Sequence, residues 1–112
     1  MSVPKLNRQL VLEAPERVAD NSGGFVEKWA ALGTHWAAID PGAAREKAGD
    51  FLTISSTSLK ITVRAAPYGA PSRPKADQRF IEGARIYRIQ AVTDAYESGQ
   101  YLVCICQEEV VS

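Results

Sequence analysis

The chain has 112 residues, which is the length of one domain with a modest core that association with other chains would stabilise. Its 13 basic and 13 acidic side chains cancel, which argues against a dedicated nucleic-acid-binding protein because such proteins carry a net basic surface. No apolar run approaches ~18 residues and no secretory leader follows Met1, so we expect neither a membrane span nor secretion.

The N-terminal third begins with a polar lead, residues 1–7, which we expect to be an arm that orders only against a neighbour. Residues 8–14 then alternate between apolar and polar side chains, which predicts the first strand. Pro15 is expected to end this strand, and the run from Asp20 to Gly24 is a dense turn signal.

The second expected strand spans residues 24–41 and contains both tryptophans, Trp29 and Trp36. They are seven residues apart, so on a regular strand their indoles would face opposite sides. A bulge or kink at Gly33 would restore a common face, because glycine inside a strand often marks one. The run from Trp36 to Ile39 is apolar on both faces, so this part is either covered on both sides or contacts another subunit.

A short helix is predicted from about Pro41 to Leu52, since Asp40 can cap it and apolar residues then recur at helical spacing. Gly42 and Gly49 each cost roughly 1 kcal/mol relative to alanine, so the helix would be marginal alone. Its outer face carries two charges of each sign, on Arg45, Glu46, Lys47 and Asp50.

The second half of the chain predicts further strands at residues 59–64, 79–82, 85–92 and 100–107. The intervening residues 65–78 contain three prolines and no periodicity, which predicts a long loop of the kind that is usually functional.

Together these elements predict a mainly β fold, a small antiparallel β-barrel or sandwich of about six strands with one short inserted helix. Strict alternation in the 85–92 strand assigns Tyr87, Ile89 and Ala91 to one face. Three of the strands are apolar on both faces, which is more than so small a domain can cover by itself. The surplus indicates association with other chains.

No motif in the sequence supports catalysis, a cofactor or a metal, and we expect no enzyme activity. His35 is the only histidine and has no accompanying nucleophile motif. Cys104 and Cys106 are two residues apart on one strand, where a disulfide would be strained, so we expect two buried, reduced thiols.

A cluster of basic and aromatic residues in the second half allows two interpretations. A basic groove with stacking aromatics would make the chain a monomeric oligonucleotide-binding small β-barrel. The favoured interpretation is an outward strand face that supplies ion pairs to a neighbouring chain, and a generic small interaction module is a third possibility. The residues concerned are Arg64, Arg73, Lys75, Arg79, Arg85 and Arg88, with Tyr68, Phe80 and Tyr87 among them.

Short motifs are spread in a defined order over nearly the whole chain. They are Leu6-Asn7-Arg8, the turn Asp20 to Gly24, the run from Trp29 to Trp36-Ala37-x-Ile39-x-Pro41, Glu46 and Ala48, Ile61-x-Val63-Arg64, Arg79-Phe80, Gly83 leading into Tyr87-x-Ile89-x-x-Val92, and Glu108-Glu109. This order resembles the head-tail joining family of tailed bacteriophages, the head-closure or stopper proteins of the neck. It resembles especially the versions carried by gene transfer agents of bacteria.

The resemblance implies a single head-tail connector domain over residues 1–112 that forms a homo-oligomeric ring, a hexamer or dodecamer. It implies a head-tail adaptor above the ring, a tail terminator or tail tube protein below it, double-stranded DNA passing non-specifically through the channel, and no membrane partner. The protein would be located in the neck of a virion or phage-like particle assembled in the bacterial cytoplasm.

The resemblance also places the segment 42–58 toward the channel, although the loop 65–78 is longer and richer in proline than the family leads us to expect. Which of the two closes the channel stays open. The hypothesised gating residues are Arg45, Glu46, Lys47 and Asp50, whose balanced charge would let DNA slide. The hypothesised interface residues are Arg8, Trp29, Trp36, Ile39, Arg64, Tyr68, Arg73 and Arg79.

Overall fold

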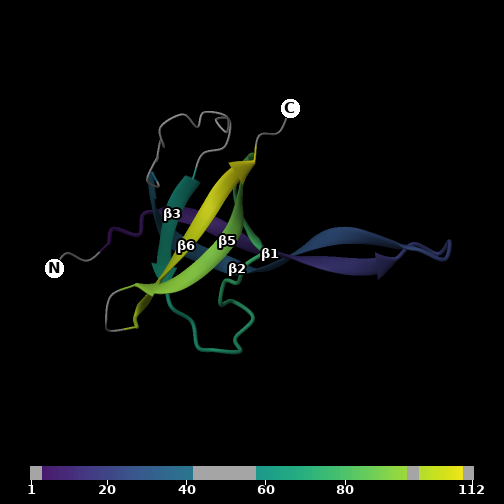
Figure 1. The fold of residues 1–112 in the computed structure, drawn as a ribbon, viewed down its shortest axis with the longest axis horizontal. Coiled ribbons are helices and arrows are strands. Elements are labelled where there is room, and N and C mark those ends of the chain that lie inside the picture. The colour runs from purple at the N-terminus through teal and green to yellow at the C-terminus, as the bar shows by residue number, and fades with distance from the viewer. Residues whose placement is uncertain (1–3, 42–57, 96–98, 110–112) are drawn as a thin grey trace, which may run out of the picture.

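Six antiparallel strands close into a barrel in a computed structural model of the chain, which describes residues 4–41, 58–95 and 99–109. The predicted mainly β fold with about six strands is confirmed, whereas the helix expected after Pro41 lies outside the described residues. The strands follow one another around the barrel in the order β1-β2-β3-β6-β5-β4 (Figure 1). They are β1 (Arg8–Ala19), β2 (Phe25–Pro41), β3 (Ser58–Arg64), β4 (Arg79–Glu82), β5 (Arg85–Ala95) and β6 (Tyr101–Glu109).

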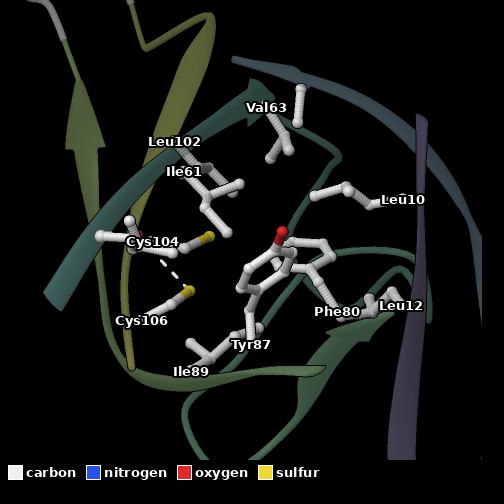
Figure 2. Close-up of a cluster of buried hydrophobic side chains, with 12 residues drawn as sticks. Leu10, Leu12, Ile61, Val63, Phe80, Tyr87, Ile89, Leu102, Cys104 and Cys106 are labelled. Carbon is white, nitrogen blue, oxygen red and sulfur yellow. Dashed lines mark hydrogen bonds between the residues drawn. The ribbon is translucent and has the colours of Figure 1, made fainter. Parts of the chain in front are cut away.

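The barrel interior is filled by alternate side chains from every strand, as the period of two requires. Phe80 and Tyr87 are the largest fully buried side chains and lie among aliphatic neighbours (Figure 2). The thiols of Cys104 and Cys106 are free and buried in the same core, as predicted. Burial raises the pKa of Cys104 to about 12, so both thiols pack as small hydrophobic groups.

The first two strands extend well beyond the barrel as a two-stranded hairpin (Figure 1). Pairing of β1 with β4 stops at Glu13 and Arg79, whereas pairing with β2 continues to Ala19 and Phe25. We call the projecting part, residues 14–30, the arm; it is distinct from the N-terminal residues 1–7. The expectation that Pro15 ends the first strand is wrong. Pro15 lies past the last β1–β4 pair, on a strand edge where a missing N–H is tolerated.

A bulge in β2 puts both tryptophans on the outer face. Leu12 pairs with Gly33 and Glu13 with Ala31, so Leu32 is the additional residue of β2 and packs against the core. Gly33 has φ +151°, a conformation that side-chain-bearing residues rarely adopt. The bulge expected at Gly33 is therefore confirmed.

A second bulge lies in β5 and was not predicted. Ile89 pairs with Cys106 and Ala91 with Ile105, which leaves Gln90 as the additional residue. The alternation therefore changes phase at Gln90. Ala91 is exposed, and Val92 instead packs against the core. The assignment of Ala91 to the face of Tyr87 and Ile89 is wrong for this reason.

The proline-rich loop 65–78 is fastened to its own barrel. Pro74 is fully buried, and Ile89 of β5 exchanges backbone hydrogen bonds of 2.9 Å with Asp77 and Gln78. His35 of β2 donates from Nε2 to the carbonyl oxygen of Ser72 over 2.7 Å. Burial lowers the pKa of His35, which favours the neutral imidazole in the folded protein.

Candidate interaction surfaces

One end of the barrel is closed by a charged network rather than by apolar side chains. Arg8 donates two hydrogen bonds of 2.7 Å to the carboxylate of Glu82, and Tyr87 donates its hydroxyl to the same carboxylate over 2.9 Å. Beside them, Arg85 forms a two-bond pair with Glu108 at 2.8 and 2.9 Å. These hydrogen bonds pair each of the four charged side chains with a partner of opposite sign at this end of the barrel.

The pKa values of this network follow from its hydrogen bonds. Arg8 holds the pKa of Glu82 below its ordinary value, and Arg85 does the same for Glu108. Burial, together with the bond to Glu82, raises the pKa of Tyr87 to about 12. Both carboxylates are thus anionic and both guanidinium groups cationic at neutral pH, as a structural network requires.

At the root of the arm, Trp29 contacts arginines of two other strands. The guanidinium of Arg79 lies 4.0 Å from the indole centroid and that of Arg88 lies 5.4 Å away. Arg79 also forms an ion pair of 2.8 Å with Glu13, its direct cross-strand neighbour. Cation–π and ion-pair contacts of this kind fix the direction in which the arm leaves β4 and β5.

In the proline-rich loop, Tyr68 is 81% exposed and covers the guanidinium of Arg73, which lies 3.9 Å from the ring centroid. Arg73 is otherwise directed inward, because it donates to the carbonyl oxygen of Ala66 over 2.7 Å and lies 3.7 Å from Asp94. Tyr68 is therefore a rigidly supported aromatic side chain on the surface.

A second exposed aromatic side chain lies on the barrel wall. Trp36 is 55% exposed, on the outward face of β2 next to β3. Ala38 and Val103 are half-buried on this face, and Thr62, which pairs with both, is 7% exposed although it faces outward. Arg64 lies at its border. We call these outward side chains of β2, β3 and β6 the Trp36 face; Trp36, Ala38 and Val103 make it mostly apolar.

The tip of the arm is shaped by Asp20. Its carboxylate accepts hydrogen bonds from the N–H groups of Ser22 at 2.8 Å and Gly24 at 3.0 Å, and these donors lower its pKa. Next to this turn, Phe25 is 61% and Val26 is 42% exposed. The turn expected from Asp20 to Gly24 is confirmed, and it presents two large apolar side chains to solvent.

The hypothesised interface residues fall into distinct places. Trp29 and Arg79 come together, as do Tyr68 and Arg73, whereas Trp36 and Arg64 share one face. Ile39 is partly buried and packs against the core. Arg8 is committed to Glu82. The gating residues Arg45, Glu46, Lys47 and Asp50 lie outside the described residues.

The arginine cluster is satisfied largely within the chain, a result that sequence reasoning missed. Arg79, Arg85 and Arg88 pair with glutamates of their own barrel, and Phe80 and Tyr87 are buried. These two aromatics are thus not available to stack on nucleic-acid bases. The partner carboxylates are unremarkable in sequence, and only the pairing of the strands brings them near the arginines, directly opposite for Glu13 and Arg79 and diagonally for the other two pairs.

Within the described ranges, no group of three or more histidine, cysteine, aspartate or glutamate side chains could hold a metal ion. In the same part of the chain, no helix has the length and apolarity needed to cross a membrane.

Comparison with known proteins identifies the family. The family model for phage head completion proteins matches residues 1–109. The chain is also similar to a chain in the structure of the virion of a native gene transfer agent particle, with 51% identity, a TM-score of 0.79, and coverage of 98% of this chain and 100% of that chain.

A second solved structure shares the fold. It is the solution structure of protein SF1141 from Shigella flexneri 2a, with 18% identity, a TM-score of 0.72 and full coverage of both chains. No curated protein matches the sequence. The match over residues 1–109 and the 51% identity to a gene transfer agent virion chain show that this chain belongs to the phage head completion protein family.

Proposed function

We propose that this chain is a structural, non-catalytic subunit of the neck of a phage-like particle. Copies of it form a ring that joins the portal and adaptor of the head to the tail and keeps the DNA channel closed until ejection. The observation that carries the proposal is the similarity to a gene transfer agent virion chain, of which the whole length is covered at 51% identity.

The surfaces of the barrel support a ring. A subunit of a closed ring needs two different lateral surfaces, because each copy contacts one neighbour with one surface and the other neighbour with the second. In the described part of the chain, large apolar side chains are exposed at the tip of the arm, with Phe25 and Val26, and on the Trp36 face, apart from Tyr68 of the loop 65–78. An isolated barrel would gain nothing from exposing both to water.

For channel closure, we assign the segment 42–58 rather than the loop 65–78. The loop is tied to its own barrel through Ser72, Pro74 and the hydrogen bonds of Ile89, so it has little freedom to open. The segment 42–58 connects β2 to β3, and its charged residues Arg45, Glu46, Lys47 and Asp50 balance in sign. A surface with balanced charge would contact DNA without binding it strongly through counterion release.

The proposed partners are the head-tail adaptor on one side of the ring and a tail terminator or tail tube protein on the other. Double-stranded DNA passes through without sequence readout. Tyr68 is the candidate contact to a neighbouring ring, because Arg73 supports its ring from below and leaves the other side in solvent.

The role in joining is tested by deleting the gene in a bacterium that produces the particles and restoring it from a plasmid. We expect the deletion strain to release heads without attached tails, and complementation to restore complete particles. Electron microscopy counts tailed and tailless heads. Tailed, DNA-filled particles at wild-type frequency in the deletion strain would refute the proposal.

The channel assignment has its own test. Replacing residues 42–52 with a short glycine-serine linker should give particles that assemble but lose DNA, measured as nuclease-protected DNA per particle. The matched control is an equal glycine-serine insertion at Gly83-Ala84, in the exposed turn between β4 and β5. Equal DNA retention in both variants would remove the assignment of this segment to the channel.

A further inference from the structure

Among the described residues, the outer part of the arm, residues 15–28, pairs with no strand outside the hairpin. Past the pair of Glu13 with Arg79, β1 pairs only with β2. The pairing of β2 with β3 is limited to residues 37–41. The arm therefore has two free edges and two open faces over residues 15–28. The part of β1 in the arm, Ala14 to Ala19, is roughly 20 Å long. This length is close to the shortest dimension of the whole molecule, 23 Å.

Both faces of the arm carry apolar side chains. The register places Ala19 opposite Phe25 on one face and Val18 opposite Val26 on the other. Phe25 and Val26 are 61% and 42% exposed, and a lone two-stranded hairpin is at best marginally stable in water. The exposed tip is thus a surface that would be stabilised by contact with another chain.

The charges of the arm cancel except at its tip. Glu16 lies opposite Lys28, and Arg17 lies opposite Glu27, so these four residues form two cross-strand pairs of opposite sign. Asp20 has no such opposite, and its N–H donors stabilise the carboxylate form. The tip therefore presents an anion beside Val26 and Phe25, and the guanidinium of Arg17 lies 4.8 Å from the centroid of the Phe25 ring.

The Trp36 face has the complementary arrangement. Its centre is the half-exposed indole of Trp36 above the small side chains of Ala38 and Thr62. Lys60 lies opposite Asp40 in the strand register. Arg64 is exposed and lies opposite Tyr101, with its guanidinium 5.9 Å from the centroid of that ring. The excess charge of this face is therefore positive, as the anionic tip requires.

The two surfaces also point in different directions. The arm leaves the barrel on the side away from β3 and β6, the strands that contribute to the Trp36 face (Figure 1). A surface on one side that fits a different surface on the other is the condition for a head-to-tail contact, which closes into a ring when the rotation between copies allows it.

We propose that the arm of each subunit lies across the Trp36 face of the next copy of this chain, with Phe25 against Trp36 and Asp20 toward Arg64. This contact rests on the proposed ring and identifies the parts of the chain that build it. The same contact covers apolar surface on both copies. The arm is therefore stabilised by the neighbouring copy that it contacts.

Cysteine cross-linking in assembled particles tests the contact. The pair Val26→Cys and Gln9→Cys puts one thiol at the arm tip and one opposite Trp36, and both positions are exposed in the free subunit. The native Cys104 and Cys106 are buried and should not react. A short bis-maleimide should convert the protein into a ladder of dimers, trimers and larger species up to the ring.

The matched control is Val26→Cys with Ala84→Cys, which moves the second thiol to the exposed turn between β4 and β5. We expect at least tenfold less ladder from this pair. A ladder of equal intensity, no ladder from the Val26→Cys and Gln9→Cys pair, or a product with the mass of a different particle protein would overturn the contact.

An immunoblot of the same purified particles separates this inference from the proposed function. If the protein is present at its wild-type amount but gives no ladder, the contact is wrong and the neck assignment stands. If the wild-type protein is absent from particles, the neck assignment is wrong and the contact falls with it. As a second readout, Phe25→Asp should reduce incorporation at least tenfold, whereas Ala84→Asp, also in an exposed position, should not.

Discussion

Gly33 is the residue on which the shape of the long hairpin depends most directly. It has φ +151° at the bulge that sets Leu32 toward the core and both tryptophans on the outer face. Replacing Gly33 with alanine adds a Cβ whose nearest other atom would be the Ser72 Cβ at 3.7 Å. This is an ordinary contact distance, so the substitution meets no steric clash.

The cost of Gly33→Ala is therefore conformational. A residue with a side chain held in such a sparsely populated region loses about 1–3 kcal/mol. For a domain near 100 residues, each kcal/mol lowers the melting temperature by about 4–8 °C. We expect Gly33→Ala to lower the melting temperature by at least about 5 °C on this scale.

Differential scanning calorimetry of the purified protein measures the effect. Thr34→Val is the matched control, because Thr34 is exposed in the adjacent position and valine keeps the branched shape; it should change stability by less than about 0.5 kcal/mol. A melting temperature of Gly33→Ala equal to that of wild type would refute the reasoning, since it would show that the bulge does not need a glycine backbone.

Three further outcomes follow from the barrel interior and its charged end. Glu82→Gln should lose about 1 kcal/mol at pH 7. Because Arg8 lowers the pKa of Glu82 from 4.5, that stabilisation is present above pH 4.5 and is lost as the pH falls through the lower pKa of the folded protein. A difference in the free energy of unfolding between the variant and wild type that persists at low pH would contradict it. Phe80→Ala, at a fully buried position, should cost about 3–5 kcal/mol in urea unfolding, and a loss below 1 kcal/mol would contradict its core position. Cys104 and Cys106 should resist a thiol reagent at pH 8 until the protein is unfolded, and rapid labelling of the native protein would contradict their burial.

The strand pattern of this chain could be predicted from sequence because local alternation reports which face is buried. The strand 59–64 is an example, where Leu59, Ile61 and Val63 all line the core. The bulge at Gly33 was also accessible, since the odd spacing of Trp29 and Trp36 and an interior glycine pointed to it. At Gln90 no glycine marks the bulge, so the change of phase that exposes Ala91 could not be read from the sequence.

The surfaces were less predictable because they depend on contacts between distant strands. Pro15 signals a strand end in sequence, but its effect depends on whether β4 continues alongside, which only the closed barrel determines. Arg8 was expected at an interface, and its pairing with Glu82, 74 positions away in the chain, could not be read from the sequence. Trp36 was expected at an interface, and its exposure is compatible with that prediction.

The central claim is that copies of this chain form a ring at the junction of head and tail and cover one another's apolar surfaces. Imaging the neck of intact particles by electron cryomicroscopy, with the subunit fitted into the density, tests it most directly. The account predicts a closed ring in which Trp36 and the arm of every copy contact an adjacent copy. A single subunit at the neck, or a ring in which both surfaces face solvent, would contradict it.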